Sequence, residues 1–522
     1  MTRDLGRLSD TTFDLLVIGA GIYGATIAWD AAQRGLSVAL VDTTTEVYPQ
    51  PRAIHFDADI MRIFQFAGVA DELEPLVRAT SGALHLGADG EPIRDFRVQP
   101  KPGDLGWMPH YMFSQPQLDG LLRERAAESA GVEALFGWTC ESIEEHDDAV
   151  EAELRDAAGS TRRVRARYLI AADGATSSIR KSLGLKLADY DFDEPWVVID
   201  GDVDDETLGP DYSVMYCDPS RPATYVPGPR THRRWEFMIL PGEDSASLGN
   251  PEAALELIHS VSPWLSPGRI EVTRAAVYRF HALVADRWRS GRVFLMGDAA
   301  HQTPPFYGQG MCHGIRDARN LTWKLRAVLR DGAPDSLLDS YQVEREPHVR
   351  AIIEQAVANG KYICVLDERE ARERDARMRE LMRNPPPQAP KTWRDTIPGL
   401  SAGLIAADGS GADGLLFPQP WVTLAGGERR RLDELLGGDS VLLTRDLASV
   451  PVGSPMRILV LGEDFADDGT LAAWFDAFDA DTVLVRPDRY VFGAARGETA
   501  TRELLAAHAA ALLGRLSETA AA

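Results

Sequence analysis

The stretch FDLLVIGAGIYGATIAWDAAQRGLSVALVD, residues 13–42, decides the fold class of this chain. Phe13–Ile18 is a short apolar run typical of a buried strand, and Gly24–Gly35 has the apolar spacing of a helix. Ser37–Asp42 is a second apolar strand. A strand, a helix and a strand in this order predict a parallel sheet covered by helices, so the fold class is α/β.

The connection between the first strand and the helix is glycine-rich, with the sequence Gly19-Ala20-Gly21-Ile22-Tyr23-Gly24. Such glycines allow a tight turn and a close approach of the backbone to a pyrophosphate, while the helix N-terminus offers free N–H groups. Asp42 ends the second strand, where an acid can accept hydrogen bonds from ribose hydroxyls. This context predicts a dinucleotide site but does not separate FAD from NAD.

A second motif, Gly297-Asp298-Ala299-Ala300-His301, follows the strand RVFLM late in the chain. Asp298 can accept hydrogen bonds from sugar-like hydroxyls. The N–H groups near Gly308–Met311, where a helix starts, can stabilise negative charge on a flat ring. An ordinary strand–turn–helix connection is the competing interpretation, but two sites of phosphate or polyol type favour a cofactor.

The remaining patterns divide the chain into segments. Residues 196–241 contain strand-like runs separated by Pro, Gly and Asp, which predict an antiparallel sheet inserted into the α/β domain. A helix from about 313 to 330 carries an apolar stripe, with Arg316, Arg319 and Lys324 largely on its other faces. The triple proline at 385–387 predicts the start of a linker before a small α/β domain. The predicted segments are 1–195, 196–285, 286–384 and 385–522.

Composition restricts the partners and the location. The formal charge of −24 disfavours nucleic acid or an anionic membrane surface as the main partner. No apolar run has the length of a membrane span, and the N-terminus lacks the features of a signal peptide, so we expect a cytoplasmic protein. Four scattered cysteines form no Cys-x-x-Cys pair, which predicts reduced thiols and no metal site.

Several long motifs in order resemble one family. The glycine motif, Ala172-Asp173-Gly174 and Gly297-Asp298 resemble the para-hydroxybenzoate hydroxylase family of FAD-dependent aromatic hydroxylases. PRAIHFDADIMRIFQ (51–65), FSQPQLDGLL (113–122) and RPDRYVFG (486–493) are similar to its 3-(3-hydroxyphenyl)propionate hydroxylase branch. The resemblance implies a Rossmann-like FAD-binding domain, an inserted antiparallel substrate sheet and a C-terminal thioredoxin-like domain, here without a Cys-x-x-Cys motif.

The resemblance also implies a reaction. NADH or NADPH would reduce FAD, and O₂ would then form a flavin hydroperoxide that hydroxylates a phenolic ring, with a 3-hydroxyphenylpropanoid-type acid as the expected substrate. A larger natural-product phenol is the alternative substrate. An FAD-dependent dehydrogenase or halogenase and a non-enzymatic flavin-binding protein are alternative functions. A homodimer is compatible with this interpretation.

The family's site residues are carried over by motif. The nucleotide-site candidate Arg180 lies just after Asp173-Gly174. His301 is assigned with equal weight to packing or to the flavin edge, and Arg233 and Arg234 to a substrate carboxylate or a solvated sheet edge. The cofactor residues implied are Gly19, Gly21, Gly24, Asp42, Arg52, Gln115, Asp173, Asp298, Pro305, Gly308, Gly310 and Met311. The candidates for catalysis are His55, His110 and Tyr225, and those for substrate binding are Tyr111, Tyr216 and Arg221.

Two departures from the family pattern and one competing interpretation accompany these assignments. The segment Ile22-Tyr23-Gly24 differs from the commoner family sequence, and Cys312 stands where many relatives have Asn. For each catalytic and substrate candidate, an ordinary structural role is the competing interpretation.

Overall fold

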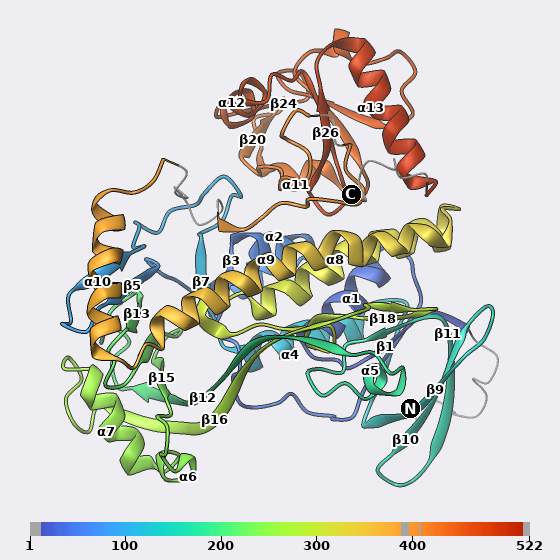
Figure 1. Ribbon diagram of the computed structural model, residues 1–522. Coiled ribbons are helices and arrows are strands. Elements are labelled where there is room, and N and C mark those ends of the chain that lie inside the picture. Colours follow the sequence, from blue (N-terminus) through green and yellow to red (C-terminus); the bar gives the residue numbers. More distant parts are fainter. Residues whose placement is uncertain (1–11, 388–395, 407–408, 515–522) are drawn as a thin grey trace.

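The computed structural model describes residues 12–387, 396–406 and 409–514. Figure 1 shows the C-terminal part of the chain above two long helices, α8 (Gly310–Arg330) and α9 (Ser340–Ile363), with the two large sheets below them.

The first sheet contains the predicted parallel core. Its central strand β1 (Thr12–Ile18) pairs in parallel with β2 (Val38–Asp42) on one side and with β11 (Thr161–Ala171) on the other. Helix α1 (Ile22–Gln33) connects β1 to β2, so the predicted strand–helix–strand unit is confirmed. The parallel strands at the margins are β8 (Val132–Phe136) and β18 (Val293–Leu295).

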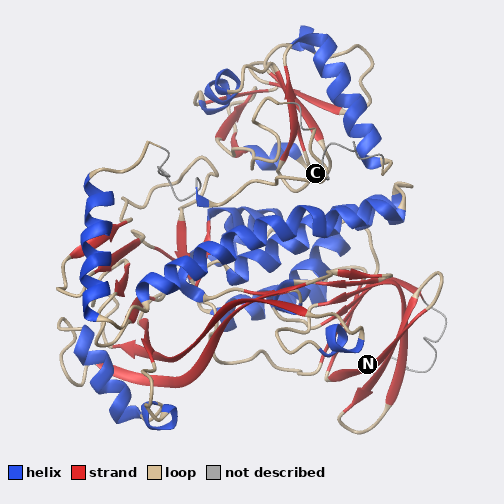
Figure 2. Cartoon of the chain, viewed as in Figure 1, coloured by secondary structure: helices blue, strands red, loops and turns tan. Residues whose placement is uncertain are grey.

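The second sheet is the predicted inserted sheet, and its order is β19-β16-β12-β15-β14-β13-β5-β6. The long antiparallel strands β12 (Leu187–Val203) and β16 (Ile270–Ala285) extend towards the first sheet, as Figure 2 shows. Strand β12 begins before residue 196, and β5 and β6 come from an earlier segment, which the sequence did not predict. The other strands are β5 (Ala83–Leu86), β6 (Pro92–Asp95), β13 (Ser213–Tyr216), β14 (Ala223–Pro227), β15 (His232–Met238) and β19 (His301–Gln302).

The two faces of the inserted sheet have different environments. Helix α7 (Pro251–Val261) covers one face, where Val197, Trp235 and Phe237 belong to an apolar cluster with the helix residue Ile258. Since successive side chains of a strand point to opposite faces, the neighbours of these strand residues face the other side.

Helix α8 is buried on more sides than its apolar stripe indicates. Arg316, Arg319 and Lys324 are all buried, because helix α2 (Ala58–Phe66), helix α9 and the C-terminal domain surround α8. An apolar stripe identifies the side that packs on the sheet, but it does not show whether a second domain covers the polar side.

The C-terminal domain is built on a mixed four-stranded sheet of order β23-β22-β25-β26. The β22–β23 pair is parallel and the other two pairs are antiparallel. The described C-terminal residues therefore form an α/β unit with its own sheet, whereas the domain bounds and the thioredoxin-like character stay predictions. Its elements include β22 (Val441–Thr444), β23 (Arg457–Val460), β25 (Thr482–Val485), β26 (Val491–Ala495), α12 (Thr470–Ala477) and α13 (Gly497–Leu512).

Buried charges attach this domain to α8 and α9. The Glu344 carboxylate lies 2.7 Å from Lys324 Nζ and 2.7 Å from Arg486 Nη2, and Arg486 also pairs with Asp488 at 2.7 Å. Burial raises the pKa of Glu344, but the opposing effect of Arg486 and Lys324 is larger and holds this pKa well below its ordinary range. Burial lowers the pKa of Lys324 to about 8. The RPDRYVFG motif thus supplies the cation that satisfies a buried carboxylate.

We expect Arg486→Ala to lower the free energy of unfolding by about 3–5 kcal/mol, because Asp488 would stay buried without its cation and Glu344 would keep only Lys324. Arg496, which pairs with Asp479 at the surface, provides the matched control, and Arg496→Ala should have little effect. Chemical denaturation of both variants would measure this, and equal effects would contradict a dominant role for the buried network.

Candidate active site

The glycine loop after β1 leaves open space at the N-terminus of α1. A Cβ at Gly24 would lie 1.7 Å from the Gly19 carbonyl oxygen, so the first and third glycines serve packing. At Gly21 an added Cβ would meet no atom within 4 Å, and no side chain caps α1. This cradle, bordered by uncapped N–H groups, fits a pyrophosphate.

Asp42 lies beside this loop, as predicted. Its Oδ2 accepts a hydrogen bond from the Ala20 N–H at 2.7 Å, and its Oδ1 accepts from the Thr44 N–H at 2.8 Å. Oδ1 also accepts from the Thr44 hydroxyl at 2.8 Å, whereas Oδ2 has a further lone pair with which the acid that shapes the loop can accept from a ribose hydroxyl.

Asp298 is oriented by a residue that the motifs did not assign. The Tyr23 hydroxyl donates to Asp298 Oδ1 at 2.9 Å, across the gap between α1 and the turn after β18. The Tyr23 ring lies against Gly297 and Gly314, where an added Cβ would approach it to 2.3 and 2.5 Å. Burial and the Asp298 carboxylate hold the pKa of Tyr23 well above its ordinary value. The departure of Tyr23 from the family pattern was visible in the sequence, but its partner Asp298 was not.

The predicted cofactor residues Arg52 and Gln115 are brought together. Gln115 Oε1 accepts hydrogen bonds from the backbone N–H groups of Arg52, at 2.8 Å, and Ala53, at 2.7 Å. Gln115 Nε2 donates to Asp119, whose pKa burial raises to about 6. Gln115 therefore sets the path of the loop that precedes His55.

The turn before α8 is held by a buried glutamine. Gly308 has a φ of 62°, and a Cβ there would lie 2.8 Å from His55 Nδ1, so both conformation and space require glycine. Gln309 is fully buried, donates to Asp57 Oδ2 at 3.0 Å and accepts from Arg316 at 2.8 Å. Pro305, Gly310 and Met311 lie on this same turn or at the start of α8.

Arg316 completes this network from the second turn of α8. Its guanidinium pairs with Asp57 and with Asp59, each at 2.7 Å. Burial raises the pKa of Asp57, but Arg316 and Gln309 lower it below its ordinary value. The flavin-lining turn predicted from Pro304–Met311 is thereby fixed to the start of α2.

The two catalytic candidates His55 and His110 are in contact. They lie on β3 (His55–Asp57) and β7 (His110–Met112), with His55 Nε2 3.0 Å from His110 Nδ1. Burial lowers the pKa of both imidazoles, that of His110 to about 3. His55 Nδ1 lies 3.1 Å from the Gly308 carbonyl and must donate to it, so His55 Nε2 accepts from His110 Nδ1. In this assignment, His110 Nε2 is an acceptor.

The tyrosine candidates are placed elsewhere. The Tyr225 hydroxyl donates to the Pro210 carbonyl at 3.2 Å, and the Tyr216 hydroxyl to the Val261 carbonyl at 2.8 Å. Both residues lie on the sheet face covered by α7. The Tyr111 hydroxyl accepts from the Met108 N–H at 3.0 Å. These contacts favour the structural interpretation: Tyr225 and Tyr216 lie on the α7 face, and the ring of Tyr111, which follows His110 on β7, stacks on Phe56.

The arginine candidates have partners within the protein. Arg221 pairs with Glu243 at 2.9 Å and donates to the Met238 carbonyl at 3.0 Å. Arg233 is fully buried and donates to backbone carbonyls, including those of Leu208 and Glu206. The solvated-edge interpretation is therefore wrong for Arg233, and it is also wrong for Arg234, which is 2% exposed.

The remaining nucleotide candidates occupy the ends of neighbouring elements. Asp173 Oδ2 accepts from the Ile179 N–H at 3.2 Å, while its buried Oδ1 has no hydrogen-bond partner in the structure. Arg180 donates to the Ala299 carbonyl at 2.9 Å, close to Asp298. His301 Nε2 lies 2.7 Å from Asp317 Oδ2 in the protein interior, and this contact supports a packing role rather than a contact with the flavin edge.

A buried carboxylate connects the inserted sheet to the loop before His55. Asp200 pairs with Arg234 at 2.8 Å and with Arg274 at 3.3 Å. Arg234 also donates to the carbonyls of Arg52, at 2.7 Å, and Pro51, at 2.9 Å. Burial raises the pKa of Asp200, but hydrogen bonding to His232 and the charge of Arg234 lower it to about 2.

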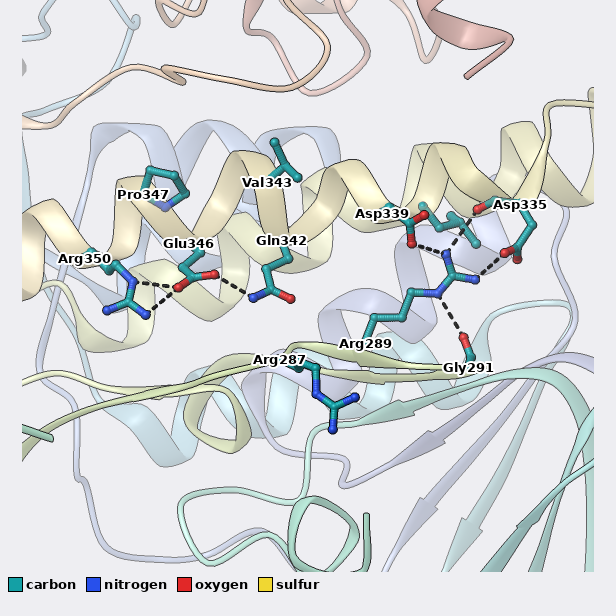
Figure 3. Close-up of a pocket in the computed structure, with 11 residues that line it drawn as sticks. Arg287, Arg289, Gly291, Asp335, Asp339, Gln342, Val343, Glu346, Pro347 and Arg350 are labelled. Carbon is teal, nitrogen blue, oxygen red and sulfur yellow. Dashed lines mark hydrogen bonds and ion pairs between the residues drawn. The ribbon is translucent and has the colours of Figure 1, made fainter. Parts of the chain in front are cut away.

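One open surface pocket of about 700 Å³ lies beside α9 and is drawn in Figure 3. Its charges pair with one another: Arg289 contacts Asp335 and Asp339, and Arg350 contacts Glu346. None of the predicted cofactor or substrate residues lines it, so we place the site at the glycine loop and the Gly308 turn.

The described part of the chain also bears on metal binding and on membrane insertion. Within residues 12–387, 396–406 and 409–514, no group of three or more His, Cys, Asp or Glu side chains is arranged to hold a metal ion. Among the helices in those ranges, none has both the length and the apolar character needed to span a bilayer.

Comparison with known proteins identifies the family. The FAD binding domain family matches residues 12–356. This chain belongs to that family. The HcaD C-terminal domain family matches residues 453–510. The open cradle at Gly21, Asp42 beside it and the orphaned Asp173 Oδ1 fit FAD, which is the cofactor.

Relatives align with this chain over nearly its whole length. The chain is 37% identical to a probable NADH-specific resorcinol 4-hydroxylase of Rhodococcus jostii, over 92% of each chain. It is 32% identical to a 3-(3-hydroxy-phenyl)propionate/3-hydroxycinnamic acid hydroxylase of Burkholderia cenocepacia, over 97% of each chain. The crystal structure of aklavinone-11 hydroxylase with FAD and aklavinone superposes with a TM-score of 0.77 at 27% identity, covering 97% of this chain and all of that one. The expected family, FAD-dependent aromatic hydroxylases, is confirmed.

Gly21→Ala tests the cradle. An alanine can adopt the φ of −68° found at Gly21, so the apoprotein should fold normally, whereas the methyl group would occupy the pyrophosphate space. We expect the dissociation constant for FAD to rise at least about tenfold, measured by flavin fluorescence titration with circular dichroism as the folding check. Gly426→Ala, where a Cβ also meets nothing, is the control and should bind FAD normally.

Asp200 predicts a pH dependence of stability. Its folded-state pKa, about 2, lies below the ordinary value of 3.8, so its stabilising contribution is present above pH 3.8 and is lost as pH falls through 2. This contribution amounts to about 2 kcal/mol. The difference in unfolding free energy between wild type and Asp200→Asn should shrink by that amount between pH 6 and pH 2. A constant difference would show that the carboxylate charge does not carry the interaction.

Proposed function

We propose that this enzyme uses NADH and O₂ to hydroxylate a phenolic ring, with the His55–His110 pair accepting the phenol proton. The observation that carries the assignment of the base is the hydrogen-bonded chain from the Gly308 carbonyl through His55 to His110. The proposed preference for NADH and for a phenol is supported by the relatives, whose names specify NADH, resorcinol or a hydroxyphenyl acid.

Bound FAD would supply hydride acceptance from the nicotinamide and activation of O₂. The Gly21 cradle, Asp42 and Asp298 would hold its diphosphate and polyol portions, while the turn at Pro305–Met311 would line its ring.

The hydrogen bonds of the histidine pair support the proposed proton transfer. Since His55 Nδ1 donates to the Gly308 carbonyl and His110 Nδ1 donates to His55, the acceptor nitrogen of His110 is Nε2, to which we propose that the phenol hydroxyl donates. As oxygen attaches to the ring, positive charge develops on the ring, and loss of the hydroxyl proton to His110 neutralises it. Anchoring of His55 to the Gly308 carbonyl keeps this base in place relative to the flavin-lining turn.

We propose that the enzyme acts on a small aromatic substrate together with FAD and O₂. The acidic composition supports a small molecule rather than nucleic acid as the partner. The homodimer and the cytoplasmic location stay predictions.

Rapid mixing of the FAD-loaded enzyme with NADH, with and without a panel of phenols, tests the proposed function. We expect one phenol to accelerate flavin reduction and to yield a hydroxylated product in air. Absence of flavin reduction by NADH or NADPH with every phenol would overturn the proposal in favour of another FAD oxidoreductase.

His110→Asn should lower the rate of product formation by about 10²-fold, because general-base assistance is lost. The rate of flavin reduction by NADH should remain within about twofold, so that reduced enzyme consumes O₂ without forming product. Stopped-flow absorbance and product analysis separate the two steps. His259→Asn, on α7, is the control, and an equal loss in both variants would remove His110 from the mechanism.

A further inference from the structure

One row of side chains crosses the face of the inserted sheet that is opposite α7. The strand register pairs Glu236 of β15 with Thr224 of β14 on one side and with Val198 of β12 on the other. Thr224 pairs with Met215 of β13, which pairs with His85 of β5, and His85 pairs with Arg94 of β6. The row is therefore Val198, Glu236, Thr224, Met215, His85 and Arg94.

The neighbouring positions of the same face show what this row faces. On one side of Glu236, Arg234 donates to the Pro51 and Arg52 carbonyls, and Val226 forms a cluster with Ile54 and Met112. On the other side, Trp196 packs against Phe306 of the flavin-lining turn, with ring centroids 5.4 Å apart. Glu236 thus lies between the segment that carries His55 and the turn that lines the flavin.

Glu236 is a buried acid to which the described residues offer no partner. The residue is 8% exposed. Across residues 12–387, 396–406 and 409–514, the neighbouring Arg234 pairs with Asp200, and no hydrogen bond or ion pair joins the Glu236 carboxyl group to another residue. Burial raises its pKa, Arg234 lowers it in part, and Asp200 raises it again. A buried carboxyl group without partners is costly, so a polar ligand is the expected compensation.

The cations near Glu236 are already engaged. Arg234 and Arg274 both pair with Asp200 and donate to backbone carbonyls of the 51–52 loop. They do not offer a charge to a substrate carboxylate.

Arg94 lies at the far end of the row, separated from Glu236 by Thr224, Met215 and His85. His85 stands between Met215 and Arg94, and its ring stacks on Tyr362 with centroids 5.8 Å apart. The Tyr362 hydroxyl contacts His85 Nδ1, and Arg94 donates to Tyr362 and Asn359 at 3.5 and 3.3 Å. Four strand spacings, about 19 Å in all, separate the backbones of Arg94 and Glu236.

We infer that Glu236 binds a ring hydroxyl of the substrate, so that the enzyme prefers a neutral polyhydroxybenzene to a phenol bearing a carboxylate. This inference rests on the proposed function and names the substrate class for it. A hydroxyl group can donate to the Glu236 carboxyl group, whereas a second carboxylate would meet a like charge beside two arginines, Arg234 and Arg274, that Asp200 already engages.

Substrate binding and turnover in Glu236→Gln test the inference. Resorcinol serves as the neutral probe and 3-(3-hydroxyphenyl)propionate as the anionic probe. Dissociation constants come from the change in flavin absorbance on titration, and kcat and KM from product formation. Glu271→Gln, an exposed acid on β16 of the same sheet, is the matched control.

We expect wild type and Glu271→Gln to favour resorcinol in kcat/KM by at least about tenfold. Glu236→Gln should weaken resorcinol binding by about tenfold, improve binding of the anionic probe, and leave FAD content and flavin reduction without a phenol unchanged. Arg94→Ala should leave resorcinol turnover unchanged.

Three outcomes would overturn the inference. The first is a wild-type preference for the anionic probe. The second is a selective loss of turnover of the anionic probe in Arg94→Ala. The third is unchanged resorcinol binding in Glu236→Gln. Failure of wild type to hydroxylate any phenol would instead reject the proposed function, so the two failures are distinguishable.

Discussion

The buried contact of Arg316 with Asp57 and Asp59 is the constraint on which the site depends. It joins the start of α8 to the start of α2, and Gln309 is held between them. The Gly308 carbonyl is thereby fixed where His55 donates to it. One ion-paired cation therefore sets both the turn that is proposed to line the flavin and the orientation of the histidine pair. A buried pair of this kind gives little net stability, but its geometry is specific.

The same principle governs the attachment of the C-terminal domain. Lys324, Arg486 and Glu344 form a buried network in which each charge depends on the others. Apolar contacts between α8 and this domain would tolerate sliding, whereas buried charges are satisfied in one arrangement only. The domain thus covers the outer side of α8, the helix that follows the proposed flavin-lining turn. Rigid support of that helix is a physical role for a domain that lacks a Cys-x-x-Cys motif.

The inserted sheet assigns roles through its two faces. Tyr225 and Trp235 are cross-strand partners on the α7 face, whereas Thr224 and Glu236, each one residue away, are partners on the other. A tyrosine is the more obvious candidate to touch a phenol, but its position in the register directs it away from the flavin-lining turn. The acid beside Trp235 belongs to the run RRWEFMIL, but nothing in that run assigned it a role.

The sequence by itself determined the parallel sheet, the glycine loop, the acid after β2 and the turn before α8. These features are local: each depends on a few consecutive residues whose spacing and conformational freedom are visible in the chain. Motif resemblance also predicted Arg52 and Gln115 as cofactor residues, and the structure shows that the two are in contact. Only the tertiary structure decided that Tyr23 contacts Asp298, that α8 is covered on its polar side, and that Tyr225 and Glu236 face opposite ways. Those outcomes depend on strand register and domain docking between residues far apart in the chain, which local pattern does not encode.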